Sequence, residues 1–198
     1  MAKVNGDKAT TLTVKAVRTW IESTSPYSQS KAFESERKEN ESHDAFDERC
    51  WRERCHVTKG LVMIPPMAFK QSIVAAAKLM NEKIPGKRNQ TWAKQFECGV
   101  LIGDGIVTDS KIEDVSSERL FVPSDGKRGG GTRVYRRFPR IDQWSGVLTW
   151  WVTAPEIIES VFRRYMDAAG LMIGIGRFRV ERGGFYGRFK VNKIEWPE

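Results

Sequence analysis

Two stretches with helical hydrophobic spacing, separated by strand-like runs, set the strongest constraint on the fold of this chain. Residues 66–86 and 153–170 each place large apolar side chains three or four positions apart, which predicts amphipathic helices. A proline opens each stretch, where it costs little because the first amide protons of a helix lack partners. Such helices must bury their apolar stripes against the intervening strands. The stripes comprise Phe69, Ile73, Ala77 and Met80 in the first stretch and Ile158, Val161, Phe162, Tyr165, Met166 and Ala169 in the second.

The second helical stretch also carries end signals. Thr153 and Glu156 have the spacing of a capping box, in which the two side chains accept hydrogen bonds from free amides of the first turn. Gly170 can close the other end of the helix. We therefore expect a helix that begins just after Thr153 and ends near Gly170.

Four runs have the character of strands. Residues 12–21 and 185–196 alternate between apolar and polar, residues 145–153 are rich in β-branched and aromatic side chains, and residues 98–109 contain a Gly-Asp-Gly turn. Together with the two helices they give the order β-α-β-β-α-β, which predicts an α+β fold with a ferredoxin-like (RRM-like) core. Two helices cover one face of such a sheet, so an insertion, another subunit or a ligand must cover the other.

Two insertions interrupt this core within a single predicted domain of residues 1–198. Residues 22–57 form a long polar excursion after the first strand, with helical character around residues 44–54. A loop of this length is unusual unless it is functional or disordered. Residues 118–142 are predicted to form a basic hairpin that projects from the body, with a glycine-rich tip at residues 123–131.

The charge balance points to a polyanionic partner, most simply nucleic acid. Lysine and arginine number 33 against 25 acidic residues, which gives a net charge of +8. The alternative is that this charge serves only solubility.

No apolar run reaches the roughly 18 residues of a membrane span, and the N-terminal residues lack the apolar core of a signal peptide. We therefore expect a cytoplasmic protein, in a host cell if the chain is viral, without a membrane partner. Three cysteines are too few for a disulfide scaffold.

The stretch GIGRFRVERGGFYGRF, residues 174–189, combines five glycines, four arginines and three phenylalanines. Glycines let a backbone approach a polyanion and expose its amide protons, while arginines make bidentate contacts with phosphate. The aromatic rings either stack on bases or pack inward, and inward packing is the more common role. Because a second basic cluster follows at residues 127–140, we interpret the arginines as nucleic-acid contacts rather than as solvated side chains.

Lys70 lies near the start of the first helix, where the dipole and the free amides favour an anion. Its alternative is an ordinary surface lysine. The candidate nucleic-acid-binding residues are Lys70, Lys127, Arg128, Arg133, Arg136, Arg137, Arg177, Arg179, Arg182 and Arg188, and the candidate glycine-rich loop comprises Gly174, Gly176, Gly183, Gly184 and Gly187.

Two of these stretches resemble motifs of the RAMP superfamily, the repeat-associated proteins of CRISPR systems. LVMIPPMAFKQSIVAAAK is similar to the family's first loop and helix, with Pro65 and Pro66 at its proline and Lys70 at its lysine. GIGRFRVERGGFYGRFKV is similar to the family's glycine-rich loop, which precedes the last strand. The resemblance covers most of the chain outside residues 22–57. It implies a CRISPR backbone-subunit-like protein, or a stand-alone or phage-borne relative, whose hairpin grips guide RNA and overlaps a neighbouring subunit.

Catalysis and metal binding are weaker alternatives. The RAMP superfamily includes guide-RNA-processing ribonucleases that generally use a histidine, and this chain has only His43 and His56. No tyrosine-lysine-histidine set can be assembled around them, so we assign no catalytic residue. These histidines also lie near Cys50 and Cys55, but the spacing of the four is not that of a recognised zinc site. We expect neither a metal nor another cofactor.

Three functions therefore remain, and the first is favoured. The chain binds single-stranded RNA or DNA with low sequence specificity, in several copies or beside CRISPR-type subunits. Alternatively, it is a metal-independent endoribonuclease that uses His43 or His56. In the third hypothesis it is a phage protein that mimics a CRISPR subunit and inhibits assembly of the complex.

Overall fold

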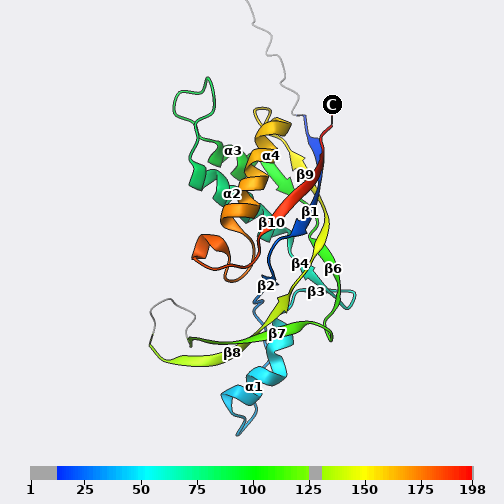
Figure 1. The fold of residues 1–198 in the computed structure, drawn as a ribbon, viewed down its shortest axis with the longest axis vertical. Helices are drawn as coiled ribbons and strands as arrows, with labels where there is room; N and C mark the ends of the chain where they lie inside the picture. The colour runs from blue at the N-terminus through cyan, green and yellow to red at the C-terminus, as the bar shows by residue number, and fades with distance from the viewer. Residues whose placement is uncertain (1–12, 125–130, 198) are drawn as a thin grey trace, which may run out of the picture.

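A computed structural model describes residues 13–124 and 131–197 of the chain. Its centre is a four-stranded antiparallel sheet with the order β10-β1-β9-β5 (Figure 1). The strands are β1 (Lys15–Ser23), β5 (Val100–Ile102), β9 (Ser145–Val152) and β10 (Phe189–Glu195), and the helices on one side of them are α2 (Pro66–Met80), α3 (Trp92–Gly99) and α4 (Glu159–Ala168). These packed layers confirm the α+β class. In chain order, β1, α2, β5, β9, α4 and β10 read β-α-β-β-α-β.

The alternation of β1 explains how the sheet forms its core. Val17, Thr19 and Ile21 face the helices and are at most 2% exposed, whereas Arg18 between them is exposed. The buried Trp150 of β9 donates a hydrogen bond from Nε1 to Thr19 Oγ1 over 3.0 Å, so both polar groups are satisfied inside the core. The sheet therefore has one apolar face that the helices cover.

The helix predicted over residues 66–86 is confirmed as α2. Pro66 occupies its first turn and Asn81, with a φ of 48°, ends it in the left-handed region. Helix α3 lies mostly in a segment for which the sequence predicts no element, and its last two residues replace the start of the strand predicted over residues 98–109, which is observed as β5 and β6. Its short apolar set is Trp92 and Phe96, which are buried against Tyr165 of α4.

Helix α4 differs from the prediction at both ends. It begins after Ile158 instead of Thr153, because the two expected capping residues have other partners. Thr153 Oγ1 donates to the carbonyl of Gly99 over 3.3 Å, and Glu156 pairs with Lys87. At the other end, a π-helical turn, η2 (Ala169–Ile173), continues past the predicted end at Gly170.

Two smaller sheets extend from the core. One has the order β2-β8-β7, with β2 (Tyr27–Ser28), β7 (Ser116–Pro123) and β8 (Arg133–Ile141). Strands β7 and β8 pair antiparallel where the basic hairpin is predicted, and residues 125–130 of its tip lie outside the described part of the chain. The other sheet has the order β3-β4-β6, with β3 (Val57–Thr58), β4 (Leu61–Ile64) and β6 (Ile106–Lys111).

The excursion of residues 22–57 contains the expected helical part, α1 (His43–Cys50), followed by the 3-10 turn η1 (Trp51–Arg54). Ser42 caps α1 by accepting a hydrogen bond from the amide of Ala45. Both elements contact β8, beneath the hairpin in Figure 1. Within the described residues, no helix is both long and apolar enough to cross a bilayer.

Candidate nucleic-acid interface

The glycine-rich loop folds tightly on itself between η2 and β10 and includes the 3-10 turn η3 (Val180–Arg182). Gly176 has a φ of 74°, and a Cβ on it would collide with the carbonyl of Ser28 and the ring of Tyr27. The amides of Ile175 and Tyr186 donate to carbonyls of the same loop, over 3.0 and 2.9 Å. Close backbone packing therefore explains the glycine content, and these amides already have protein partners.

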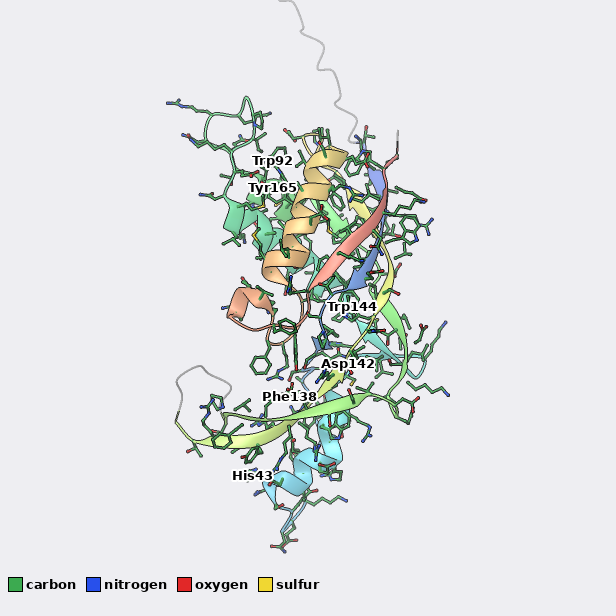
Figure 2. All side chains as sticks on the ribbon, in the orientation of Figure 1. His43, Trp92, Phe138, Asp142, Trp144 and Tyr165 are labelled. Atoms are coloured by element: carbon green, nitrogen blue, oxygen red, sulfur yellow. The ribbon has the colours of Figure 1, made fainter. Side chains whose placement is uncertain are left out.

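The loop lies against the β7–β8 hairpin, so the two basic segments of the sequence are neighbours. The guanidinium carbon of Arg177 lies 3.1 Å from the ring centroid of Phe138 on β8. Tyr186 donates a hydrogen bond from its hydroxyl to Glu118 of β7 over 2.6 Å. In Figures 1 and 2 the loop and the hairpin project toward the same side of the molecule. A binding surface shared by the glycine-rich loop and the hairpin requires that the two segments be neighbours in this way.

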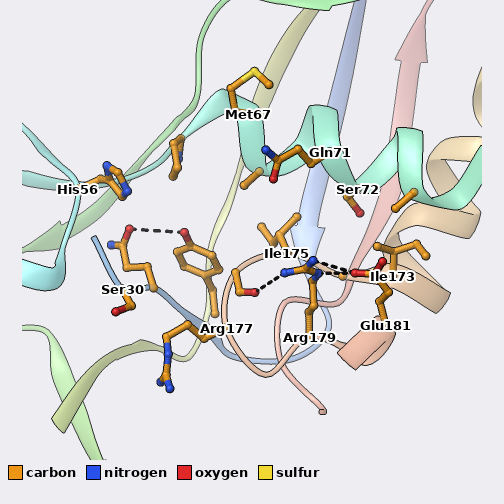
Figure 3. Close-up of a pocket in the computed structure, with 17 residues that line it drawn as sticks. Ser30, His56, Met67, Gln71, Ser72, Ile173, Ile175, Arg177, Arg179 and Glu181 are labelled. Atoms are coloured by element: carbon orange, nitrogen blue, oxygen red, sulfur yellow. Dashed lines mark hydrogen bonds and ion pairs between the residues drawn. The ribbon is translucent and has the colours of Figure 1, made fainter. Parts of the chain in front are cut away.

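A first cavity, of about 310 Å³, lies between the start of α2, the glycine-rich loop and the chain after β2 (Figure 3). Arg177 and Arg179 border it from the loop. The guanidinium group of Arg179 donates from Nε and Nη2 to the carboxylate of Glu181, over 2.8 Å in each case. Arg179 also donates to the carbonyl of Gly176. His56 lies at the opposite end of the cavity in Figure 3.

A second cavity, of about 720 Å³, lies between the excursion and the hairpin. Its lining combines the aromatic rings of Phe33, Phe46 and Tyr135 with the cations of Arg54 and Arg136. Ser30 lines both cavities, so they adjoin across this exposed residue. We call the two cavities together the channel. The first of them lies at the start of α2 and the second at the hairpin.

Buried cations stabilise the wall of the channel. Arg54 is 7% exposed and donates from Nη2 to Asp47 Oδ1 over 2.7 Å. Phe138 contacts two guanidinium groups, that of Arg177 and that of Arg54 at 5.2 Å from its centroid. Burial, with repulsion from Arg54, lowers the pKa of Arg177 to about 10, so the group is still a cation at neutral pH. Its Nη1 is buried without a hydrogen-bond partner among the described residues.

His56 lines the first cavity, and its pKa is shifted by its surroundings. Burial first, and then the charge of Lys31, lowers its pKa below the ordinary value. The imidazole is therefore neutral at physiological pH and can accept a proton.

The structure places three of the sequence-predicted arginines on the channel, namely Arg136, Arg177 and Arg179, together with Gly174 and Gly176. The others have different surroundings. Arg133 lies over Phe121, and Arg137 pairs with Glu48. Arg182 pairs with Glu181, and the backbone amide of Arg188 donates to Ser25. Gly183, Gly184 and Gly187 belong to the folded loop but line neither of the two cavities. Lys127 and Arg128 lie outside the described residues.

Lys70 is placed differently from the sequence prediction. Its ammonium group donates to the backbone carbonyls of Phe96, Glu97 and Val100, at the end of α3. Those carbonyls lack partners within the helix, and a cation there also complements the helix dipole. Lys70 therefore stabilises the packing of α2 on α3, and we leave it out of the proposed interface.

Several channel residues were not predicted from the sequence, among them Gln29, Ser30, Lys31, Arg54 and Gln71. All except Gln71 belong to the excursion. Its unusual length was the one sequence signal that this segment is functional. The predicted alternative of a shared zinc site is not formed, since His43 lines the second cavity and His56 the first. Across the described residues, no group of three or more His, Cys, Asp or Glu side chains is arranged to hold a metal.

Comparison with known proteins gives similarities in structure but none in sequence. No family model and no curated protein matches the chain. Among solved structures, the chain is similar to a chain of the cryo-EM structure of the Type III-B Cmr-beta bound to cognate target RNA, with a TM-score of 0.44 and 12% sequence identity. The match covers 92% of this chain and 60% of the other. Similarity at this level does not define a family.

Proposed function

We propose that this protein binds single-stranded nucleic acid, RNA in the first instance, along the channel. The observation that supports the proposal is the shared lining residue Ser30, because it makes neighbours of the cavity that carries the arginines of the glycine-rich loop and the cavity that carries Arg136 of the hairpin. The order β-α-β-β-α-β and the loop between α4 and β10 agree with the resemblance to RAMP proteins. We extend the proposal accordingly to a CRISPR backbone-subunit-like protein that assembles in several copies along the strand.

The chemistry of the channel suits a single strand better than a duplex. Arg136 and Arg179 supply cations for phosphates, while Phe33, Phe46 and Tyr135 in the second cavity offer flat rings for unpaired bases. Bases inside a duplex are already stacked and cannot reach such rings. Phosphate contacts carry no sequence information, so we expect low sequence specificity.

The test is the affinity of the full chain for labelled single-stranded RNA, measured by fluorescence anisotropy. Arg136→Gln and Arg179→Gln each remove one channel cation and are expected to weaken binding about 5- to 10-fold. Lys94→Gln is the matched control, because Lys94 is exposed on α3, where it pairs with Glu97 away from the channel. Equal affinities for all four proteins would contradict the proposal.

His56 supports a second candidate function, cleavage of the bound RNA without a metal. The neutral imidazole supplies a proton acceptor at one end of the cavity, and Arg179 at the other end supplies a cation for the bound strand. Incubation of labelled RNA with the protein in EDTA tests this candidate. Cleavage that is lost in His56→Ala, with retained RNA affinity, supports it, whereas tight binding without cleavage leaves the binding function alone.

A further inference from the structure

The face of the four-stranded sheet opposite the helices carries a second set of side chains that the channel does not use. Leu101, Val147 and Trp151 on this face are 51%, 38% and 37% exposed. The alternate residues of the same strands are buried under the helices, so the exposed set faces away from them. The ring of Trp151 lies close to Gly103, just after β5, where a Cβ would collide with it, and the rest of this set is open to solvent to the extent given by its exposure.

Each of the two central strands contributes one tryptophan to this open face. Trp20 of β1 pairs with Val147 of β9, and Trp151 of β9 pairs with Ala16 of β1. Directly opposed residues of an antiparallel pair point to the same face, so both indoles are on the same side of the sheet. They lie four residues apart along the strands, which corresponds to roughly 14 Å.

Cations surround the first tryptophan. The guanidinium carbon of Arg18 lies 4.9 Å from the centroid of the Trp20 ring, and Lys193 Nζ lies 4.6 Å from it. Both side chains are more than half exposed and share one acidic partner, Glu195. Both cations lie over the ring, and because they are exposed they can turn toward the phosphates of a strand whose base replaces them on the indole.

The composition of this face favours nucleic acid over a protein partner. The centre of a protein–protein interface is usually depleted of charged residues. Here Arg18 and Glu195 occupy the row between the two tryptophans, and Lys193 lies directly beside Trp20 on β10. Four-stranded sheets with aromatic rings on an open face are a general platform on which successive unpaired bases stack.

From this placement we infer a second contact surface for single-stranded RNA, in which one base stacks on Trp20 and another on Trp151, while Arg18 binds a phosphate between them and Lys193 binds a phosphate next to the first base. This surface shares no lining residue with the channel. It therefore extends the footprint of a bound strand beyond the proposed function and can be tested independently of it.

The experiment measures the affinity of the full chain for a labelled single-stranded oligouridine. Trp20→Ala and Trp151→Ala are each expected to weaken binding about tenfold, as loss of one base–aromatic stack does. Trp20→Phe retains a flat ring and is expected to stay within about threefold of the unmodified protein. Leu79→Ala is the control, because Leu79 is an apolar side chain with 60% exposure on α2, away from this face.

A second measurement uses the unmodified protein, so that it does not depend on the folding of a variant. Ultraviolet crosslinking to the same oligouridine, followed by peptide mapping, should yield crosslinked peptides that contain Trp20 or Trp151. Unchanged affinity in both alanine variants, with no crosslink in β1 or β9, would overturn the inference. Loss of self-association in Trp151→Ala with unchanged RNA affinity would also overturn it, because a second copy would then be the occupant. Arg136→Gln and Arg179→Gln test the channel separately.

Discussion

Asp47 forms a buried ion pair within the excursion and a hydrogen bond to the hairpin. It accepts hydrogen bonds from Arg54 and from the backbone amide of Arg137 on β8. Asp47→Asn removes the charge that compensates the buried guanidinium and should lower the free energy of unfolding by about 3 kcal/mol. Asp44→Asn is the control, since its exposed pair with Arg119 is worth at most about 1 kcal/mol. Urea unfolding of both variants tests this, and equal losses would contradict it.

Lys70 separates a stabilising role from a binding role. Lys70→Met leaves the carbonyls at the end of α3 without their donor, so the free energy of unfolding should fall by about 1–3 kcal/mol. The affinity for RNA should be unchanged at a temperature where the variant is folded. Lys78→Met, which removes an exposed ion pair on the same helix, should leave both quantities nearly unchanged. Reduced RNA affinity with normal stability would instead assign Lys70 to the interface.

His56 should make stability depend on pH. Its pKa is lowered in the folded state, so the unfolded chain binds a proton more readily as the pH falls below the ordinary value of about 6.5. The unmodified protein should therefore lose more stability than His56→Gln between pH 7.5 and about pH 5. Urea midpoints measured across this interval test the sign, and parallel curves for the two proteins would contradict it.

The glycine-rich loop is a rigid element rather than a flexible one. Gly176→Ala forces a side chain into the left-handed region and against Ser28, which should destabilise the protein by about 1–3 kcal/mol. Gly131→Ala is the matched control, because a Cβ there meets no atom within 4 Å. Thermal melts of the two variants should differ by several degrees, and equal melting temperatures would show that the loop tolerates side chains.

The sequence predicted the elements whose signals are local. Helix α2 and strand β9 follow directly from hydrophobic period and composition. Helix α3 has too few apolar residues for its period to be recognised, and its end depends on Lys70, which is 26 to 30 residues away from the carbonyls that it binds. The start of α4 was displaced because Thr153 has a tertiary partner, the carbonyl of Gly99.

The candidate site was also predicted only in part, because it depends on contacts between residues that are distant in sequence. Basic composition identified Arg136, Arg177 and Arg179, which line the channel. Composition cannot distinguish them from Arg137, whose partner Glu48 comes from the excursion. The contribution of residues 29–33 depends on the position of the excursion against β8, which no local pattern encodes.

As a whole, the molecule joins its two basic segments by packing the excursion and the glycine-rich loop against one hairpin. Arg177 and Arg54 both stack on Phe138, so the ring connects three segments that are distant in sequence. A net charge of +8 attracts a polyanion from a distance, and the channel provides the contacts at short range. The excursion is therefore a structural part of the proposed interface.

The salt dependence of single-stranded RNA affinity tests this arrangement most directly. Each phosphate neutralised on a single strand contributes a slope of about −0.7 to the plot of log affinity against log salt concentration. We expect a slope of about −2 or steeper for the unmodified protein, reduced by about 0.7 in each of Arg136→Gln and Arg179→Gln and by about twice that in the double variant. A flat plot, or a double variant with the slope of the unmodified protein, would show that the two segments do not hold one nucleic-acid strand between them.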